Sequence, residues 1–133
     1  MEIKRLETKG IGELEMVPDF VKEKALALAV AIQETDEYKD FLEKEDGLKK
    51  DEIAQELLSK FQEKQREFIS KQLNGEVDQE LLGELTEIQA QLNRRESVVD
   101  FLDSYNRLIN LLNEIGEIIS KQIEFDFGEA YRS

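Results

Sequence analysis

Side chains that could carry out catalysis are scarce in this chain of 133 residues. It has no cysteine and no histidine, which excludes thiolate nucleophiles, imidazole bases, disulfides and the usual zinc and iron–sulfur ligands. Ser–His and Cys–His catalysis cannot be assembled from the remaining residue types. The Gly-rich phosphate-binding patterns and the Gly-x-Ser-x-Gly pattern of hydrolases are also missing. The composition therefore predicts a protein that is not an enzyme and has no cofactor.

Carboxylates are the one abundant reactive group. The stretch 34–52 holds nine of them against four lysines, and hard cations such as Mg²⁺ and Ca²⁺ prefer oxygen ligands of this kind. The acidic residues do not follow the alternate spacing of an EF-hand loop, and they are mixed with lysines at helical spacing. We interpret the stretch as a solvated helix face. A metal-dependent enzyme is the alternative hypothesis, and binding of a divalent cation would test it.

Arg94 and Arg95, with Arg107 further along, form the main basic grouping outside the mixed lysine–glutamate faces. The pair could contact an acidic partner or a phosphate, or it could cap the end of a helix dipole in a hydrated turn. Acidic residues outnumber basic ones by 31 to 18, which gives a net charge of −13. Such a charge repels a phosphate backbone, so we expect no direct binding of nucleic acid.

The apolar residues recur mainly at helical spacing, which predicts an all-α protein. A first helix should begin at Pro18-Asp19 and continue through an Ala-rich run at 25–32. Because that run is apolar on all sides, we expect the helix to be buried. Thr35 is the expected N-cap of a short second helix that ends at Gly47.

Two long helices, over 51–74 and 78–93, should form an antiparallel hairpin. The pair Asn74-Gly75 is a typical helix end. Gln65 lies where an apolar residue is expected; it either fixes the register of an interface through hydrogen bonds or is partly exposed at the edge of the seam. The second helix carries a seam of coiled-coil type at Leu81, Leu85, Ile88 and Leu92.

The last helix, from an N-cap at Ser97 to residue 123, has the widest apolar face. One line at heptad spacing should be its buried seam, with Leu112 central and Tyr105 a core aromatic whose hydroxyl reaches the rim. We expect the Ala-rich helix and a second copy of the chain to cover this face, so that dimerisation completes the bundle. The line consists of Val98, Leu102, Tyr105, Ile109, Leu112, Ile119 and Ile123.

Three segments are expected along the chain. Residues 1–17 have irregular apolar spacing and two glycines, which suits an N-terminal arm or a short β-hairpin. Residues 18–123 should form the helical bundle domain, and 124–133 a C-terminal tail. The N-terminus does not read as a signal peptide, and no apolar run is long enough to span a membrane. We therefore expect a cytoplasmic protein that does not bind membranes.

The order and spacing of several motifs resemble the YlbF/YmcA family of small helical bacterial proteins, the competence regulators. The likeness covers about residues 20–123. It rests on Phe61-Gln62-Glu63-Lys64-Gln65, Gln72-x-x-Gly75, Glu84-Leu85 through Leu92-Asn93, and Phe101-Leu102 followed by Leu108, Leu111-Leu112, Ile115 and Ile119.

The resemblance implies an all-α fold built on a long antiparallel hairpin, with association into dimers or higher bundles. It also implies a non-catalytic regulator of competence, sporulation and biofilm formation that acts through ribonuclease Y and messenger-RNA maturation. Some relatives bind iron–sulfur clusters through cysteines, and this chain has no cysteine to do so.

The sequence thus favours a helical protein-interaction module, a regulatory or accessory subunit of a cytoplasmic complex. Its expected partners are itself, related helical proteins and a ribonuclease complex. The alternatives are a holdase that uses apolar patches at the hairpin ends, or a homo-oligomer of another role. The expected interaction residues are Leu81, Leu85, Ile88, Leu92, Leu102, Tyr105, Ile109, Leu112, Ile119, Gln65, Arg94 and Arg95.

Overall fold

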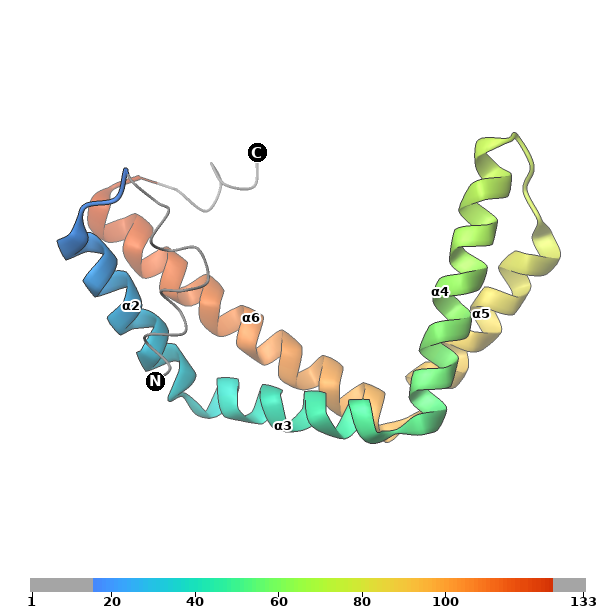
Figure 1. Ribbon diagram of the computed structural model, residues 1–133, viewed down its shortest axis with the longest axis horizontal. Coiled ribbons are helices and arrows are strands. Elements are labelled where there is room, and N and C mark those ends of the chain that lie inside the picture. Colours follow the sequence, from blue (N-terminus) through green and yellow to red (C-terminus); the bar gives the residue numbers. More distant parts are fainter. Residues whose placement is uncertain (1–15, 126–133) are drawn as a thin grey trace. The chain divides into compact units, whose positions relative to one another are not determined.

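The computed structural model describes residues 16–125, and within that range the chain forms five helices and no strand. This confirms the all-α prediction. The arm or hairpin expected at 1–17 and the tail at 124–133 lie almost wholly outside the described residues, so the three-segment division stays a prediction. The helices are α2 (Asp19–Gln33), α3 (Asp36–Lys50), α4 (Glu52–Leu73), α5 (Gln79–Asn93) and α6 (Glu96–Ile123) (Figure 1).

The chain divides into two compact units, residues 1–40 and 41–133, which we describe separately. The described part of the first contains α2, which begins directly after Pro18 as predicted. The expectation that this Ala-rich helix is buried is wrong, because none of its residues is fully buried and Phe20 is 70% exposed. The short alanine side chains leave little surface to bury within one chain.

Helix α3 begins as predicted, because the Thr35 hydroxyl accepts a hydrogen bond from the N–H of Tyr38 (3.2 Å). The predicted end at Gly47 is wrong, and the helix continues to Lys50. Ion pairs one turn apart span the glycine: Lys49 lies 3.8 Å from Glu45, and Lys50 2.8 Å from Asp46. The two lysines also lie at the negative end of the helix dipole, which offsets the weak helix propensity of glycine.

Helices α4 and α5 form the predicted antiparallel hairpin (Figure 1). Asp51 caps α4 by accepting a hydrogen bond from the N–H of Ala54 (3.1 Å), and Asp78 caps α5 in the same way through Leu81 (3.0 Å). The turn between them uses Gly75 at φ +83°, a backbone conformation that glycine adopts without strain.

The core of the second unit lies where α4, α5 and α6 meet. Ala54 from α4 is fully buried against Ile88 and Leu92 from α5 and Val98 from α6. Partly buried side chains from α3 and α4 close the cluster: Leu48, Leu57, Leu58 and Phe61. This packing holds the hairpin on the first turn of α6.

Helix α6 begins at Glu96 with Arg95 in the N-cap position, so the predicted cap at Ser97 is wrong. The expected buried line is wrong in part as well. Its residues after Val98 are exposed or half-buried, whereas Ser104 (1% exposed) and Leu108 (8%) are buried. Ser104 can be buried because its hydroxyl donates to the Phe101 carbonyl (2.8 Å). Across residues 16–125, no helix is long and apolar enough to cross a membrane.

Candidate interaction surfaces

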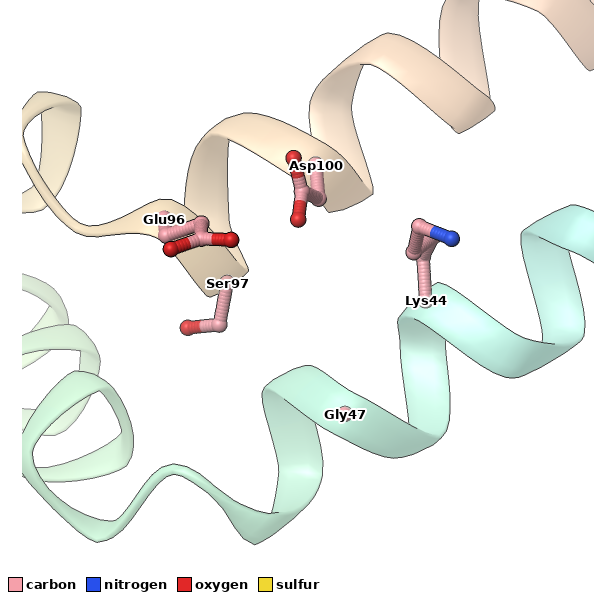
Figure 2. A pocket seen from close by; sticks show the side chains of 5 residues that line it. All are labelled: Lys44, Gly47, Glu96, Ser97 and Asp100. Carbon is pink, nitrogen blue, oxygen red and sulfur yellow. The ribbon is translucent and has the colours of Figure 1, made fainter.

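The described residues contain no group of three or more His, Cys, Asp or Glu side chains that could hold a metal ion. One hollow of about 320 Å³ lies between α3 and α6 (Figure 2). Figure 2 shows Glu96, Ser97 and Asp100 on α6, with Lys44 and Gly47 on α3. The Ser97 hydroxyl donates a hydrogen bond to the carboxylate of Asp51, the N-cap of α4, at 2.6 Å. The chain has no imidazole or thiol that could activate this hydroxyl. We assign no chemistry to this hollow.

Asp51 and Arg95 form a polar contact that joins the start of α4 to the start of α6. The guanidinium donates two hydrogen bonds to the carboxylate, from Nε and Nη2, both at 2.9 Å. Ser97 donates a third at 2.6 Å, and the N–H of Ala54 a fourth. The bonds from Arg95, then those from Ser97 and Ala54, hold the pKa of the Asp51 carboxyl well below its usual value. The contact ties the start of α4 to the start of α6.

This contact places the two arginines of the predicted basic pair in different roles. Arg95 is bound by Asp51, so the Nε–Nη2 edge of its guanidinium is already used within the chain. Arg94 is exposed, and its guanidinium lies 4.0 Å from Glu87. Sequence reasoning identified Asp51 as a helix start but missed its partner, because no local pattern links residues 44 positions apart.

Two further ion pairs join the helices of the hairpin. Lys71 lies 2.7 Å from Asp78 across the turn, and Lys64 lies 2.8 Å from Glu84 midway along. The hydrogen bond from Lys71 lowers the pKa of Asp78, and the same bond raises the pKa of Lys71. Gln65, next to Lys64, is exposed on α4. The two ion pairs, Lys71–Asp78 and Lys64–Glu84, fix the register of α4 against α5.

The predicted interaction residues on α5 lie inside the hairpin. Leu81 and Leu92 are each 4% exposed, and Leu85 and Ile88 are each 8% exposed. Their apolar surface is therefore buried within the chain, and a partner cannot contact it in this conformation. The seam predicted from their spacing of four, three and four residues is real, but it is intramolecular.

The predicted interaction residues on α6 lie mainly at the surface. Leu102 is 45% exposed, Tyr105 44% and Leu112 39%, while Ile109 and Ile119 are half-buried. We name these five residues together with Gly116 the α6 stripe. Leu112 is therefore not the central buried residue that the spacing predicted.

An aromatic cluster supports one end of the stripe. The rings of Phe41 and Phe101 have centroids 5.6 Å apart, and each lies 6.2 Å from the ring of Tyr105. One side of the Tyr105 ring thus packs against the other two aromatic rings, and the rest of the side chain is exposed. This packing fixes the orientation of the Tyr105 ring.

A second apolar surface lies at the free end of the hairpin, which we name the hairpin tip. Leu73 is 83% exposed there, with Val77 at 58%, Ile69 at 48% and Leu82 at 41%. The sequence analysis expected apolar patches at the hairpin ends but identified none of these residues. Leu82 directly follows the buried seam residue Leu81, and the other three lie within or beside the turn that joins the two helices.

Together, these features define a helical hairpin protein whose described surface offers apolar faces. Residues 21–124 match the model of the family described as "Control of competence regulator ComK, YlbF/YmcA". The chain therefore belongs to this family, as its motifs predicted, and the family is one of regulators and not of enzymes.

Individual relatives agree with this assignment. A UPF0342 protein of Pediococcus pentosaceus is 34% identical over 94 residues, which cover 70% of this chain and 82% of that protein. One from Oceanobacillus iheyensis is 28% identical, covering 77% and 89%. A chain in the crystal structure of Bacillus subtilis RicA in complex with RicF is similar in fold, with a TM-score of 0.72 and 22% identity over 77% of this chain and 92% of that one.

Proposed function

We propose that this chain is a non-catalytic protein-interaction module, a regulatory or accessory subunit of a cytoplasmic complex. One observation carries the proposal: among residues 16–125, large apolar side chains that are exposed outnumber those that are buried. Soluble monomers rarely leave contiguous apolar faces uncovered, and faces of this kind are typical of association sites. The α6 stripe and the hairpin tip are two such surfaces.

The partners we propose are related helical proteins and the chain itself. Membership of a family of competence regulators supports a role in competence, and the family resemblance extends this role to sporulation and biofilm formation. The similar fold in the RicA–RicF crystal structure supports a complex with a protein partner, because that structure is of RicA in complex with RicF. Action through ribonuclease Y-dependent RNA processing is the finest step of the proposal, and it follows from the family resemblance alone.

Affinity capture from the native host tests this function. The tagged chain is expressed at its natural level and captured with and without nuclease, and mass spectrometry identifies what accompanies it. We expect related helical proteins, with or without a ribonuclease, in amounts that nuclease does not change. A variant with Leu73→Glu and Leu112→Glu, which changes both surfaces, is the matched control and should lose them. Recovery of the chain by itself would contradict a complex with relatives.

A holdase is the second candidate function, and the hairpin tip is the observation that favours it. Leu73 is more exposed there than any other large apolar side chain of α4, and an exposed apolar end of two helices offers such contacts to an unfolded chain. The test is suppression of the aggregation of a model substrate at equimolar concentration, compared with a Leu73→Ser variant. Absence of suppression by the unmodified chain would remove this function.

A further inference from the structure

The two sides of the α4–α5 hairpin differ in charge. Residues that face the opposite helix recur at steps of three and four, over 54–71 on α4 and 78–92 on α5, and each is buried or half-buried. The residue directly after each of them is turned by about 100°, and in an antiparallel pair these following residues share one side of the hairpin. None of them is charged. The residues directly before lie on the other side, and six of those eleven are glutamates, with Lys60 the one cation. We name these the uncharged side and the acidic side.

The hairpin tip lies where the two sides meet. Ile69 belongs to the uncharged side, and Leu73, which is 83% exposed, lies one helical turn beyond it at the end of α4. Glu76 is exposed in the turn that follows, and Glu80 is exposed on the acidic side, in the first turn of α5. A helix laid across this end of the hairpin can contact both sides at once, whereas a helix laid along the hairpin can contact only one.

The cations near the tip are few and are already engaged or distant. Residues 66–84 contain five carboxylates and two cations, Arg66 and Lys71. Lys71 lies 2.7 Å from Asp78 and 3.8 Å from Glu67, so its charge is compensated within the hairpin. Arg66 lies seven residues before the end of α4, which is about 10 Å along the helix axis. The potential at the tip is therefore negative.

Glu76 and Glu80 determine which kind of ligand this end can accept. Both are exposed, and the ion pairs of the described hairpin involve neither of them. An acidic ligand, or the tip of a second copy, would be repelled. An uncharged ligand would remove water from the carboxylates without supplying a counter-charge. A ligand that carries lysine or arginine beside an apolar row complements both the carboxylates and the apolar residues.

We propose that the hairpin tip binds a basic amphipathic helix of a partner protein, laid across the end of the hairpin. The apolar row of that helix packs on Ile69, Leu73 and Leu82, and its basic side chains contact Glu76 and Glu80. An apolar centre with a polar rim is the usual arrangement of protein interfaces, and an amphipathic helix is a common ligand of apolar surfaces. The proposal deepens the function proposed above, on which it rests, by giving the chemistry of one partner.

Fluorescence anisotropy with two labelled synthetic peptides tests this chemistry. Each peptide is a helix of about 18 residues with leucines at steps of three and four, and the other positions carry lysine in one peptide and glutamate in the other. In about 0.15 M salt, the purified chain should bind the lysine peptide at least about tenfold more tightly. Equal binding of both peptides would overturn the proposal and favour the holdase, which needs no charge. Failure to bind the lysine peptide would also overturn it.

Paired charge variants locate the binding, because a chain with a net charge of −13 attracts a basic peptide to its whole surface. Glu76→Gln together with Glu80→Gln should weaken binding of the lysine peptide at least about fivefold. Glu23→Gln together with Glu114→Gln is the matched control, since both residues are exposed on other helices and the net charge changes equally. Equal weakening by the two double variants would show general attraction and overturn the proposal.

A second pair of variants tests the apolar contact. Leu73→Ser should weaken binding of the lysine peptide about tenfold. Leu112→Ser makes the same change at an exposed residue of the α6 stripe and should leave the binding unchanged. Circular dichroism checks that both variants keep their helices. Equal effects of the two variants, or no effect of Leu73→Ser, would contradict docking at the hairpin tip.

The peptide measurements and the capture experiment can fail separately, because the first use the purified chain and the second uses the native complex. Absence of peptide binding with retention of captured relatives would refute the basic helix as the ligand of the hairpin tip. The proposed function would then remain intact.

Discussion

Removing the side chain of Leu92 should destabilise the protein strongly. Leu92 is 4% exposed and lies in the cluster with Ala54, Ile88 and Val98, where three helices meet. Leu92→Ala deletes three carbon groups, worth about 2.4 kcal/mol in transfer free energy at full burial. The cavity that remains adds to this, so the expected cost is about 3 kcal/mol of unfolding free energy. For a domain of this size, that lowers the Tm by roughly 10 °C.

The assay is urea unfolding followed by circular dichroism, at two protein concentrations so that association and folding can be separated. Leu82→Ala is the matched control because it makes the same change on the same helix at a position that is 41% exposed. No closed cavity forms there, and the expected cost is about 1 kcal/mol or less. If Leu92→Ala costs less than about 1 kcal/mol, or if the two variants cost the same, the hairpin core described here is wrong.

Four further outcomes are expected. The folded-state pKa of Asp51 lies below its usual value of 3.8, so the contacts of its carboxylate stabilise the fold above pH 3.8 and are lost as the pH falls below it. The difference in urea midpoint between the unmodified chain and the Asp51→Asn variant should therefore become smaller in acid. A difference that does not change with pH would contradict this. Gly47→Ala should stabilise the fold by up to about 1 kcal/mol, because the helix continues through this residue and an added Cβ meets no atom. Gly75→Ala should cost about 1 kcal/mol because of the positive φ, and thermal unfolding of both variants checks the opposite signs. Raising the salt concentration from about 0.05 to 0.5 M should tighten self-association, because salt screens the repulsion between two copies of charge −13 and the α6 stripe has no ion pairs to lose. Weaker self-association at high salt, measured by sedimentation, would refute this.

Much of the local structure could be predicted from the sequence. The cap at Thr35, the helix starts at residues 51 and 78 and the turn at Gly75 were all identified from residue type and spacing, because each depends on atoms within a few positions. The end at Gly47 was predicted wrongly for a related reason. Glycine weakens a helix by only about 1 kcal/mol, and the lysine–carboxylate pairs that span it favour continuation of α3.

The candidate surfaces were harder to predict. Periodicity locates apolar residues on a helix face, but it cannot say which neighbour covers that face. The seam of α5 was expected to bind partners and is filled by the chain's own hairpin, whereas the line through Leu112 was expected to be buried and is largely exposed. The heptad line and the true buried line of α6 differ by about one position, and both are apolar. The buried line includes Ser104, a polar residue that a search for apolar positions passes over.

The sequence by itself determined the helical class, the absence of thiol and imidazole chemistry, the hairpin and the family. Composition, local caps and the order of motifs depend only on residue types and their spacing along the chain. Only the tertiary structure decided which apolar rows are used within the chain and which remain available. It also joined Asp51 to Arg95 across 44 positions. These outcomes depend on how helices distant in sequence pack together, and each helix has more apolar surface than a single neighbour can cover.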